Sequence, residues 1–435
     1  SPVSACTAYG TWSMISAHSQ PIPHSAMVVK TPSQRQDTAV GTAYLLLAAL
    51  AALVGGGVSV LAGMGMLPAT DLCGRLTQAH PALMLLYVVV PALVSGFGTL
   101  WLPRALGREH MVLGRLNLAG VGMLALSFVL TCTLADARLA HVLWSIGALM
   151  SAMVLLTTIF DSCADSRTQT SFSPFVWGEM LSATVVLLST PVFAAAVLRT
   201  WLWPAASPVV GAEYFAAPVG LIVLLAGFGI VFEMAARIGQ VQTRPVAYIM
   251  ASTAAIGMVA WAKSSLAHGS DSQNALLIGN AGLALCSLSA VCLAGLWLAG
   301  TWRARVSLHT PLLWGMGFLA VVAGGWVVQL VQGTGLHPAL QLGALYAVCG
   351  GFYLWRGEAC GFWYPQALAR LQFGLTAAAT LCLFGSGMQV LGCALFGMAA
   401  VVFVLAAAIS FQRAIPVPNN AAGVVEADAA RSAVV

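Results

Sequence analysis

Charged side chains are scarce in this chain. Only 7% of its 435 residues are Asp, Glu, Lys or Arg, whereas 60% are hydrophobic and the mean hydropathy is +0.90. Water-soluble domains carry about 25% charged residues, so that class of protein is excluded. Apolar runs of roughly 20 residues, long enough to cross a bilayer as helices, recur from about 40 to 412. The composition therefore predicts an integral membrane protein of the all-α class.

Several chemical motifs are also absent. The ten cysteines are scattered singly and form no CxxC pair, which argues against a thiolate cluster or a disulfide framework. The sequence has no Gly-rich phosphate loop, no HExxH motif and no nucleophile elbow. The net charge of +5 is modest and gives no reason to expect nucleic acid as a partner. The partner that the composition does predict is the lipid bilayer.

The apolar runs predict one membrane domain, residues 39–412, of twelve transmembrane helices. A polar segment, 1–38, precedes it on the cytoplasmic side, and we expect Met27 in that segment to be the start of translation. The tail 413–435 is rich in Pro, Asn and Ala and is expected to be disordered. The predicted spans are 40–66, 76–103, 112–134, 138–161, 174–200, 214–237, 245–267, 274–300, 311–332, 337–356, 366–389 and 391–412.

Basic residues test this count, because cytoplasmic loops of membrane proteins carry the excess of Lys and Arg. With the N-terminus inside, fourteen of the eighteen basic residues fall in cytoplasmic segments and four in outer segments. If one helix had been miscounted, the basic residues after it would be assigned to the wrong side of the membrane, and the bias would disappear. The sequence therefore predicts an even number of spans with the N-terminus in the cytoplasm or its mitochondrial equivalent.

Histidine is the informative residue type. Of eight histidines, only His80 and His337 fall in the apolar opening of a predicted helix, the second and the tenth. Both helices start at the outer face, so two imidazoles at one depth could ligate the two sides of a haem iron. The alternative is that each is an interfacial histidine bonded to backbone or water. A polar side chain within a membrane helix is often functional, which keeps the first interpretation open.

Longer segments resemble a known family. The stretch "AHPALMLLYVVVPALVSGFGTLWLPRALG" (79–107), followed by "RLN" (115–117), is similar to the second helix of cytochrome c oxidase subunit I, a haem–copper oxidase. The resemblance continues in the family's order through "SPFVWGEMLSATVVLLSTPVF" (173–193), "TPLLWGMGFL" (310–319) and "GFYLW" (351–355). It implies the fold of haem–copper oxidase subunit I, with twelve helices over about 40–412.

The resemblance gives the two histidines a role. In that family, one histidine of the second helix and one that opens the tenth hold the low-spin haem. His80 matches the first, and His337 matches the second through its spacing to "GFYLW". The resemblance therefore implies that His80 and His337 are the axial ligands of one low-spin haem, of b or a type.

The ligands of the family's oxygen-reducing centre are replaced in this chain. Gly335 stands where the family has the histidine of the second haem. The single copper ligand of the sixth helix and the glutamate and tyrosine that follow it align with "APVGL" (217–221), which places Ala217, Val219 and Leu221 at these positions. The paired histidines of the seventh helix, which are the other two copper ligands, align with Lys263 and Ser264. We therefore expect no copper site.

Proton delivery and the haem surroundings also depart from the family. The aspartate at the entrance of one proton channel aligns with His110, and the helix I arginine that contacts the formyl group of haem a aligns with Gly63. The family's paired propionate-binding arginines have no counterpart in 385–397. The cations that could replace them are Arg75, Arg138 and Lys263, and each could equally be an interfacial charge that reaches water. Two further acidic residues, Glu179 and Glu233, are expected to be solvated carboxylates near cytoplasmic helix ends.

These departures predict a haem-binding electron-transfer subunit of a respiratory-type complex that cannot reduce oxygen. Its expected partners are other subunits of that complex and a cytochrome c-like or quinol donor, in a bacterial or mitochondrial inner membrane. Saturated ligation of the iron favours electron transfer, because no position is open for oxygen. One alternative is a structural pseudo-subunit of such a complex, with or without haem. Another is a working terminal oxidase subunit with relocated ligands.

Overall fold

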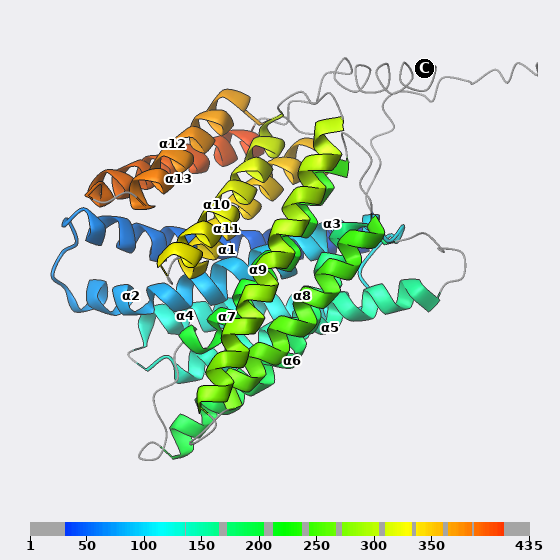
Figure 1. Ribbon diagram of the computed structural model, residues 1–435, viewed down its shortest axis with the longest axis horizontal. Helices are drawn as coiled ribbons and strands as arrows, with labels where there is room; N and C mark the ends of the chain where they lie inside the picture. The colour runs from blue at the N-terminus through cyan, green and yellow to red at the C-terminus, as the bar shows by residue number, and fades with distance from the viewer. Residues whose placement is uncertain are drawn as a thin grey trace, which may run out of the picture.

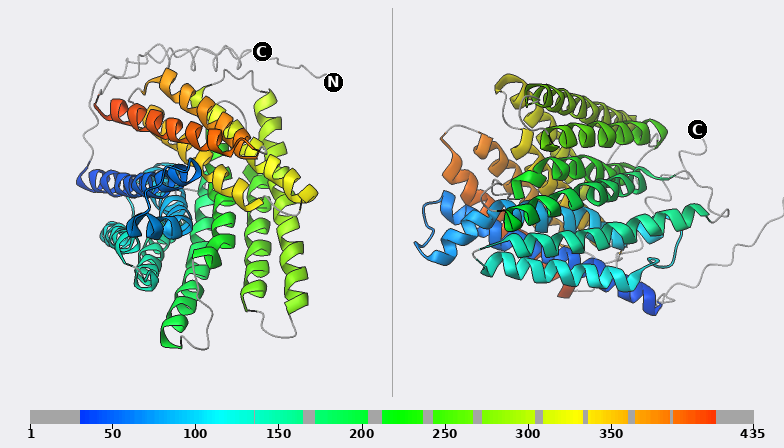
Figure 2. Two further views of the ribbon diagram at one scale, coloured as in Figure 1. Left: turned by 90° about the vertical axis from the view of Figure 1, so that its left-hand side faces the viewer. Right: turned by 90° about the horizontal axis from the view of Figure 1, so that it is seen from below.

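The protein is described by a computed structural model for residues 31–134, 136–164, 172–203, 212–236, 243–266, 272–303, 309–332, 336–359, 364–384 and 387–412. Within these ranges every regular element is a helix (Figures 1 and 2). The all-α prediction is therefore confirmed. The predicted segment up to residue 30, the predicted tail 413–435 and Gly335 lie outside the described residues.

Twelve helical rods follow one another along the described chain, the second of them built from three pieces. Their bounds are α1 Pro32–Gly63; α2 Asp71–Ala82, η1 Leu83–Gly96 and α3 Phe97–Ala105; α4 Gly114–Thr133; α5 Arg138–Ala164; α6 Pro174–Leu202; α7 Ala216–Ala236; α8 Thr243–Leu266; α9 Ser272–Arg303; α10 Thr310–Gln332; α11 Leu336–Leu354; α12 Gln366–Phe384; and α13 Gln389–Gln412. Two short turns, η3 Ala212–Phe215 and η5 Trp355–Ala359, adjoin α7 and α11.

Eleven helices of the described chain are long and apolar enough to cross a membrane. α11 is not among these eleven, although it packs between α10 and α7 where the tenth span is predicted. The first helix begins at Pro32, eight residues before the predicted start at 40, because Thr31 caps it and a proline fits the first helical position. The remaining predicted spans coincide with helices to within a few residues.

The second span is wound as a π-helix through its middle. Leu83–Gly96 has the wider winding, and three prolines, Pro81, Pro91 and Pro103, interrupt the span. A proline has no N–H and its ring pushes away the carbonyl four residues earlier, so the backbone relaxes outward there. The rod nevertheless continues from Asp71 to Ala105 as one candidate span.

This rod and α7 form the centre of the bundle. Their most apolar windows are 83% and 89% buried inside the protein, against 17% for α13. Pairs of outer helices surround them: α4 with α5, α8 with α9, and α12 with α13. Figure 2 shows the α8–α9 pair at one edge of the bundle and the α12–α13 pair beside α1. The outer helices expose many large apolar side chains, as expected for surfaces that face lipid.

Glycine sets the distance between α6 and α7. A Cβ at Gly178 would lie 2.6 Å from the carbonyl oxygen of Leu225 and 3.2 Å from the Cα of Gly229. The two backbones therefore touch, as small residues commonly allow in membrane proteins. We expect Gly178→Ala to destabilise the fold by about 1 to 3 kcal/mol, because the atoms it meets belong to the backbone and cannot rotate away.

The matched control for that substitution is Gly122→Ala in α4, where an added Cβ has no heavy atom within 4 Å. Because alanine is the better helix former, this variant should be unchanged or slightly stabilised. The measurement is the midpoint of thermal unfolding in one detergent. Equal midpoints for both variants would show that the α6–α7 contact is not tight.

Candidate cofactor site

His80 lies in the last turn of α2, half-buried, and bonds to the neighbouring helix. Its Nδ1 is 3.0 Å from the carbonyl oxygen of Gly55 in α1. A carbonyl oxygen only accepts, so Nδ1 carries the proton and Nε2 keeps its lone pair. A histidine that binds a metal through one ring nitrogen commonly donates from the other nitrogen in this way. His80 therefore has the tautomer and the support that an iron ligand needs.

Three consecutive glycines of α1 lie where His80 contacts that helix. Gly55 itself is buried, and a Cβ there would lie 2.7 Å from the terminal methyl group of Met84. By contrast, Gly56 and Gly57 have no heavy atom within 4 Å of an added Cβ. The end of α1 approaches the start of α13 (Figure 1). Large apolar side chains are exposed on these helices, on α2 and in the adjoining loops: Leu61, Met66, Leu72, Met388 and Leu391.

His337 is the second residue of α11, and its side chain lies outside the part that the structure describes. The backbone around it does have a defined place. Leu85 of η1 and Leu340 of α11 line one small pocket, together with Val219 and Gly220 of α7. His80 precedes Leu85 by five residues, and His337 precedes Leu340 by three. The two segments that carry the histidines therefore approach each other at the face of the bundle where both helices begin.

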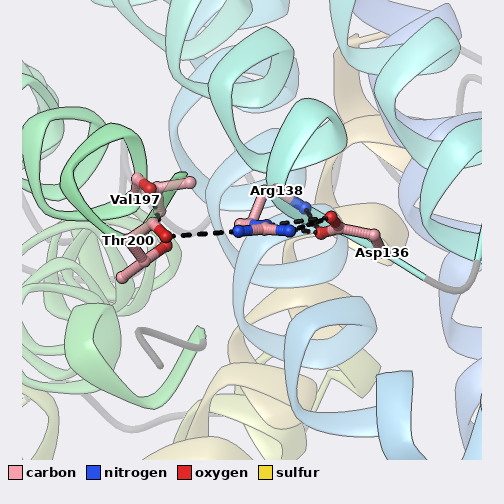
Figure 3. Close-up of polar contacts among 4 residues, drawn as sticks. All are labelled: Asp136, Arg138, Val197 and Thr200. Carbon is pink, nitrogen blue, oxygen red and sulfur yellow. Dashed lines mark hydrogen bonds and ion pairs between the residues drawn. The ribbon is translucent and has the colours of Figure 1, made fainter. Parts of the chain in front are cut away.

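The three candidate cations differ in their surroundings. Arg138, at the start of α5, donates to both carboxylate oxygens of Asp136 and from Nη1 to the carbonyl oxygen of Thr200 at 3.2 Å (Figure 3). Its guanidinium also lies 5.8 Å from the ring centroid of Trp201. Arg138 thus ties the loop before α5 to the end of α6, so the suggestion that it supplies a free cation is wrong.

Arg75 and Lys263 are both exposed, near the end of the bundle where α2 begins and α8 ends. Arg75 shares α2 with His80 and precedes it by five residues, about 7.5 Å along the helix axis. Lys263 lies on α8, on which no candidate haem ligand is found. Of these two cations, only Arg75 shares a helix with a candidate ligand, although the two side chains leave α2 about 140° apart around its axis.

The expectation that Glu179 is a solvated carboxylate is wrong. This residue is 0% exposed in α6, and neither carboxylate oxygen has a hydrogen-bond partner among the described residues. Glu233 of α7 is half-buried. The sequence placed both near helix ends, and it gave no signal that α3 and α5 cover Glu179.

A buried hydrogen-bond network was also not predicted. The Tyr44 hydroxyl donates at 3.1 Å to the side chain of Asn117, whose Nδ2 donates to Thr99 Oγ1 at 2.9 Å. Asn117 belongs to the "RLN" segment, but its partners come from α1 and α3 and cannot be read from spacing. His110, predicted to replace a proton-channel aspartate, is exposed, and its Nδ1 lies 3.1 Å from the carbonyl oxygen of Met111.

The fold and these residues can now be compared with known proteins. Residues 39–333, more than half of the chain, match the family described as Cytochrome C and Quinol oxidase polypeptide I. The chain belongs to this family. One relative, "Cytochrome c oxidase subunit 1" of Cereibacter sphaeroides, is 24% identical over 369 residues. The alignment covers 70% of this chain and 65% of the relative, so the chain spans less than two thirds of that protein's length.

The polypeptide I positions expected to hold the oxygen-reducing centre are apolar and packed in this chain. On α7, Val219 is 1% exposed and Leu221 is 6% exposed. A Cβ at Gly220 would lie 3.1 Å from Leu340 of α11, and one at Gly257 of α8 would lie 2.3 Å from Leu221. Apolar side chains thus fill these contacts of α7 with α8 and α11, and Val219, Leu221 and Leu340 offer a metal ion no nitrogen or oxygen ligand.

The other positions of that centre differ in their surroundings. Ala217 and Lys263 are exposed, and the side chain of Ser264 lies outside the described part, as does Gly335. In the ranges that the structure covers, no three His, Cys, Asp or Glu side chains come together as a metal site. A copper ion does not fit these residues of this polypeptide I homologue.

The Asp136–Arg138 pair yields a pH prediction. Hydrogen bonds from the Arg138 side chain and backbone lower the pKa of Asp136 below its usual value of 3.8. The stability that the carboxylate contributes is therefore fully present above pH 3.8 and is lost as the pH falls through the lowered pKa. Asp136→Asn should lower the midpoint of thermal unfolding slightly at neutral pH, and this difference should shrink at about pH 3.

A double variant provides the control for the ion pair. If the loss comes from the pair, Asp136→Asn combined with Arg138→Gln should be no less stable than the less stable single variant. A difference between wild type and Asp136→Asn that stays constant from neutral to acid pH would contradict this account.

Proposed function

We propose that this chain is a haem-binding electron-transfer subunit of a respiratory-type complex, with His80 and His337 as axial ligands of one low-spin haem. The observation that carries the proposal is the 3.0 Å contact from His80 Nδ1 to the Gly55 carbonyl oxygen, which leaves Nε2 available to iron. A haem held by two histidines supplies a one-electron carrier with no open position for oxygen. The backbone approach of α11 to η1 supports the second ligand.

Packing at the centre of the bundle argues against oxygen reduction by this chain. Val219 and Leu221 stand where the resemblance expects polar groups, and both are buried among apolar neighbours. A working oxidase needs a second metal centre as well as protons delivered to it. Without ligands on α7, the chain offers one redox site, and its role is to pass electrons rather than to consume oxygen.

The contact between α1 and α13 favours haem b over haem a. A Cβ at Gly63 would lie 2.4 Å from Cys393 Sγ, so no larger side chain fits there while the helices keep their distance. Gly63 aligns with the arginine that contacts the formyl group in the family. Haem b has no formyl group, so the absence of this arginine removes no contact from a haem of b type.

The excess of basic residues in alternate loops supports an N-terminus on the inner side of a bacterial or mitochondrial inner membrane. His80 and His337 then lie toward the outer face. A haem at that depth fits an electron donor at the outer surface or in the outer leaflet, either a cytochrome c-like protein or a quinol. Other subunits of the complex would supply the onward path.

The first test is the spectrum of the purified protein. We expect one low-spin haem per chain that does not respond to carbon monoxide, and a pyridine haemochrome of b type. His80→Ala and His337→Ala should each abolish the low-spin spectrum or convert it to high spin, because each removes one axial ligand. His110→Ala is the matched control, since this exposed histidine lies at the opposite face.

Other spectra would point elsewhere. Protein that purifies without haem would leave the structural pseudo-subunit as the function. A high-spin haem that binds carbon monoxide would contradict the proposed ligation and reopen the possibility of an oxidase.

The second test concerns the haem propionates. If Arg75 neutralises one of them, Arg75→Gln should lower the midpoint potential of the haem by on the order of 10 to 40 mV, because removing a nearby positive charge stabilises the ferric form. The measurement is a redox titration followed optically. Arg138→Gln is the control. Because Arg138 forms an ion pair with Asp136, the haem of this variant should have the same midpoint potential as the haem of the wild type. Equal shifts in both variants would rule out a specific role for Arg75.

A further inference from the structure

Glu179 occupies an unusual position for a carboxyl group. It is the sixth residue of α6, about 8 Å from the start of that helix. Its exposed fraction is 0%, and neither of its oxygens has a hydrogen-bond partner in the described structure. In apolar surroundings an unpaired carboxylate costs several kcal/mol, so the group needs an explanation.

The carboxyl lies between α3, α5 and α6. A Cβ at Gly98 of α3 would lie 3.2 Å from a carboxylate oxygen of Glu179 and 2.7 Å from Leu155 of α5. Glycine at 98 thus provides the space into which the carboxyl extends. The preceding residue, Gly178, meets the backbone of α7 instead, so Glu179 faces α3 and α5 rather than α7.

Ser182 provides a second unsatisfied group beside the first. It follows Glu179 by three residues, which places both on one face of α6 a single turn apart. Ser182 is also 0% exposed, and its Oγ has no partner among the described residues. Two neighbouring side chains thus have donors and acceptors that the described protein does not satisfy.

Among the described residues, no counter-ion balances Glu179. None of the charged or histidine side chains on the helices packed against α6 lies within ion-pair or hydrogen-bond distance of its carboxyl. The carboxyl therefore carries its proton, because a charge without a partner would not be buried here. These side chains are Arg104 of α3, Arg138, His141 and Asp161 of α5, Glu233 of α7, and Arg244 and Lys263 of α8.

We propose that Glu179 and Ser182 form a buried water-binding site in which the glutamic acid holds an exchangeable proton. A water there would accept from the carboxylic O–H and bond to the Ser182 hydroxyl, which satisfies both side chains at once. When the proton leaves, the carboxyl O–H bond breaks and the water takes the proton. On return the same bond re-forms, and no electron is transferred. This site is separate from the haem proposal and independent of it.

The short route to solvent runs to the face at which α6 begins. Beyond the first turn of α6 on that side, the end of α5 carries the half-exposed ion pair of Asp161 and Arg108. Along α6 toward the other face, 23 residues follow Glu179, about 35 Å of helix. Proton exchange therefore occurs with the face where the chain enters its first helix, which the basic residues predict to be the inner one.

The test is infrared difference spectroscopy of wild type against Glu179→Gln at neutral pH, in H2O and in D2O. We expect one protonated carboxylic C=O band per chain in the wild type, absent from the variant and shifted downward by D2O. Ser182→Ala should change the frequency of this band, because it removes a partner of the shared water. Glu233→Gln is the matched control on α7, and the band should remain.

Three results would overturn the proposal. Carboxylate bands in place of the C=O band would mean that Glu179 is ionised, and a band that never shifts in D2O would mean a dry site. A band unchanged by Ser182→Ala would show that the two residues share no water. The haem spectrum of Glu179→Gln keeps this test apart from the haem proposal. If this variant does not fold, the isotope shift and Ser182→Ala still decide.

Discussion

Direct contact of α7 with η1 and α11 closes the centre of this bundle, and the other features depend on it. In a membrane, helices associate through close packing rather than through the hydrophobic effect, so the apolar faces of α7 and its neighbours must fit one another. Gly178 and Gly220 allow that fit by bringing α6 and α11 close to α7. Once Val219 and Leu221 occupy the interior, a metal centre there would need both new ligands and new space. The closed centre therefore limits redox chemistry to the periphery.

His80 is the place at the periphery where that chemistry is best supported. Its ring contacts the carbonyl of Gly55 at 3.0 Å, and the absence of a side chain at Gly55 lets the second span approach α1 closely there. The next two residues, Gly56 and Gly57, have open space where a Cβ would lie. Toward its end, α1 closes onto α13 again, where Gly63 meets Cys393.

Features set by one helix could be predicted from the sequence, whereas those set by neighbouring helices could not. Hydropathy predicted the spans because the length and apolarity of each are local, and the family resemblance selected His80. The burial of Glu179 was missed because it depends on Gly98, distant in sequence but adjacent in space. The Arg138 pair could have been found, since Asp136 lies two residues away in the same loop. The π-winding had a signal in Pro81, Pro91 and Pro103, but such prolines also fit a kinked α-helix.

The two proposed sites lie at opposite faces, and this separation has a physical consequence. His80 is close to the face where α2 begins, whereas Glu179 is close to the face where α1 and α6 begin. The charge on a ferric haem would act on Glu179 only through the apolar centre, and no described residue bonds to the carboxyl oxygens of Glu179. The proton of Glu179 would therefore exchange with solvent at its own face of the bundle, and the redox state of the proposed haem would have little effect on it. A chain with this arrangement can pass electrons near one surface and bind protons near the other without coupling the two.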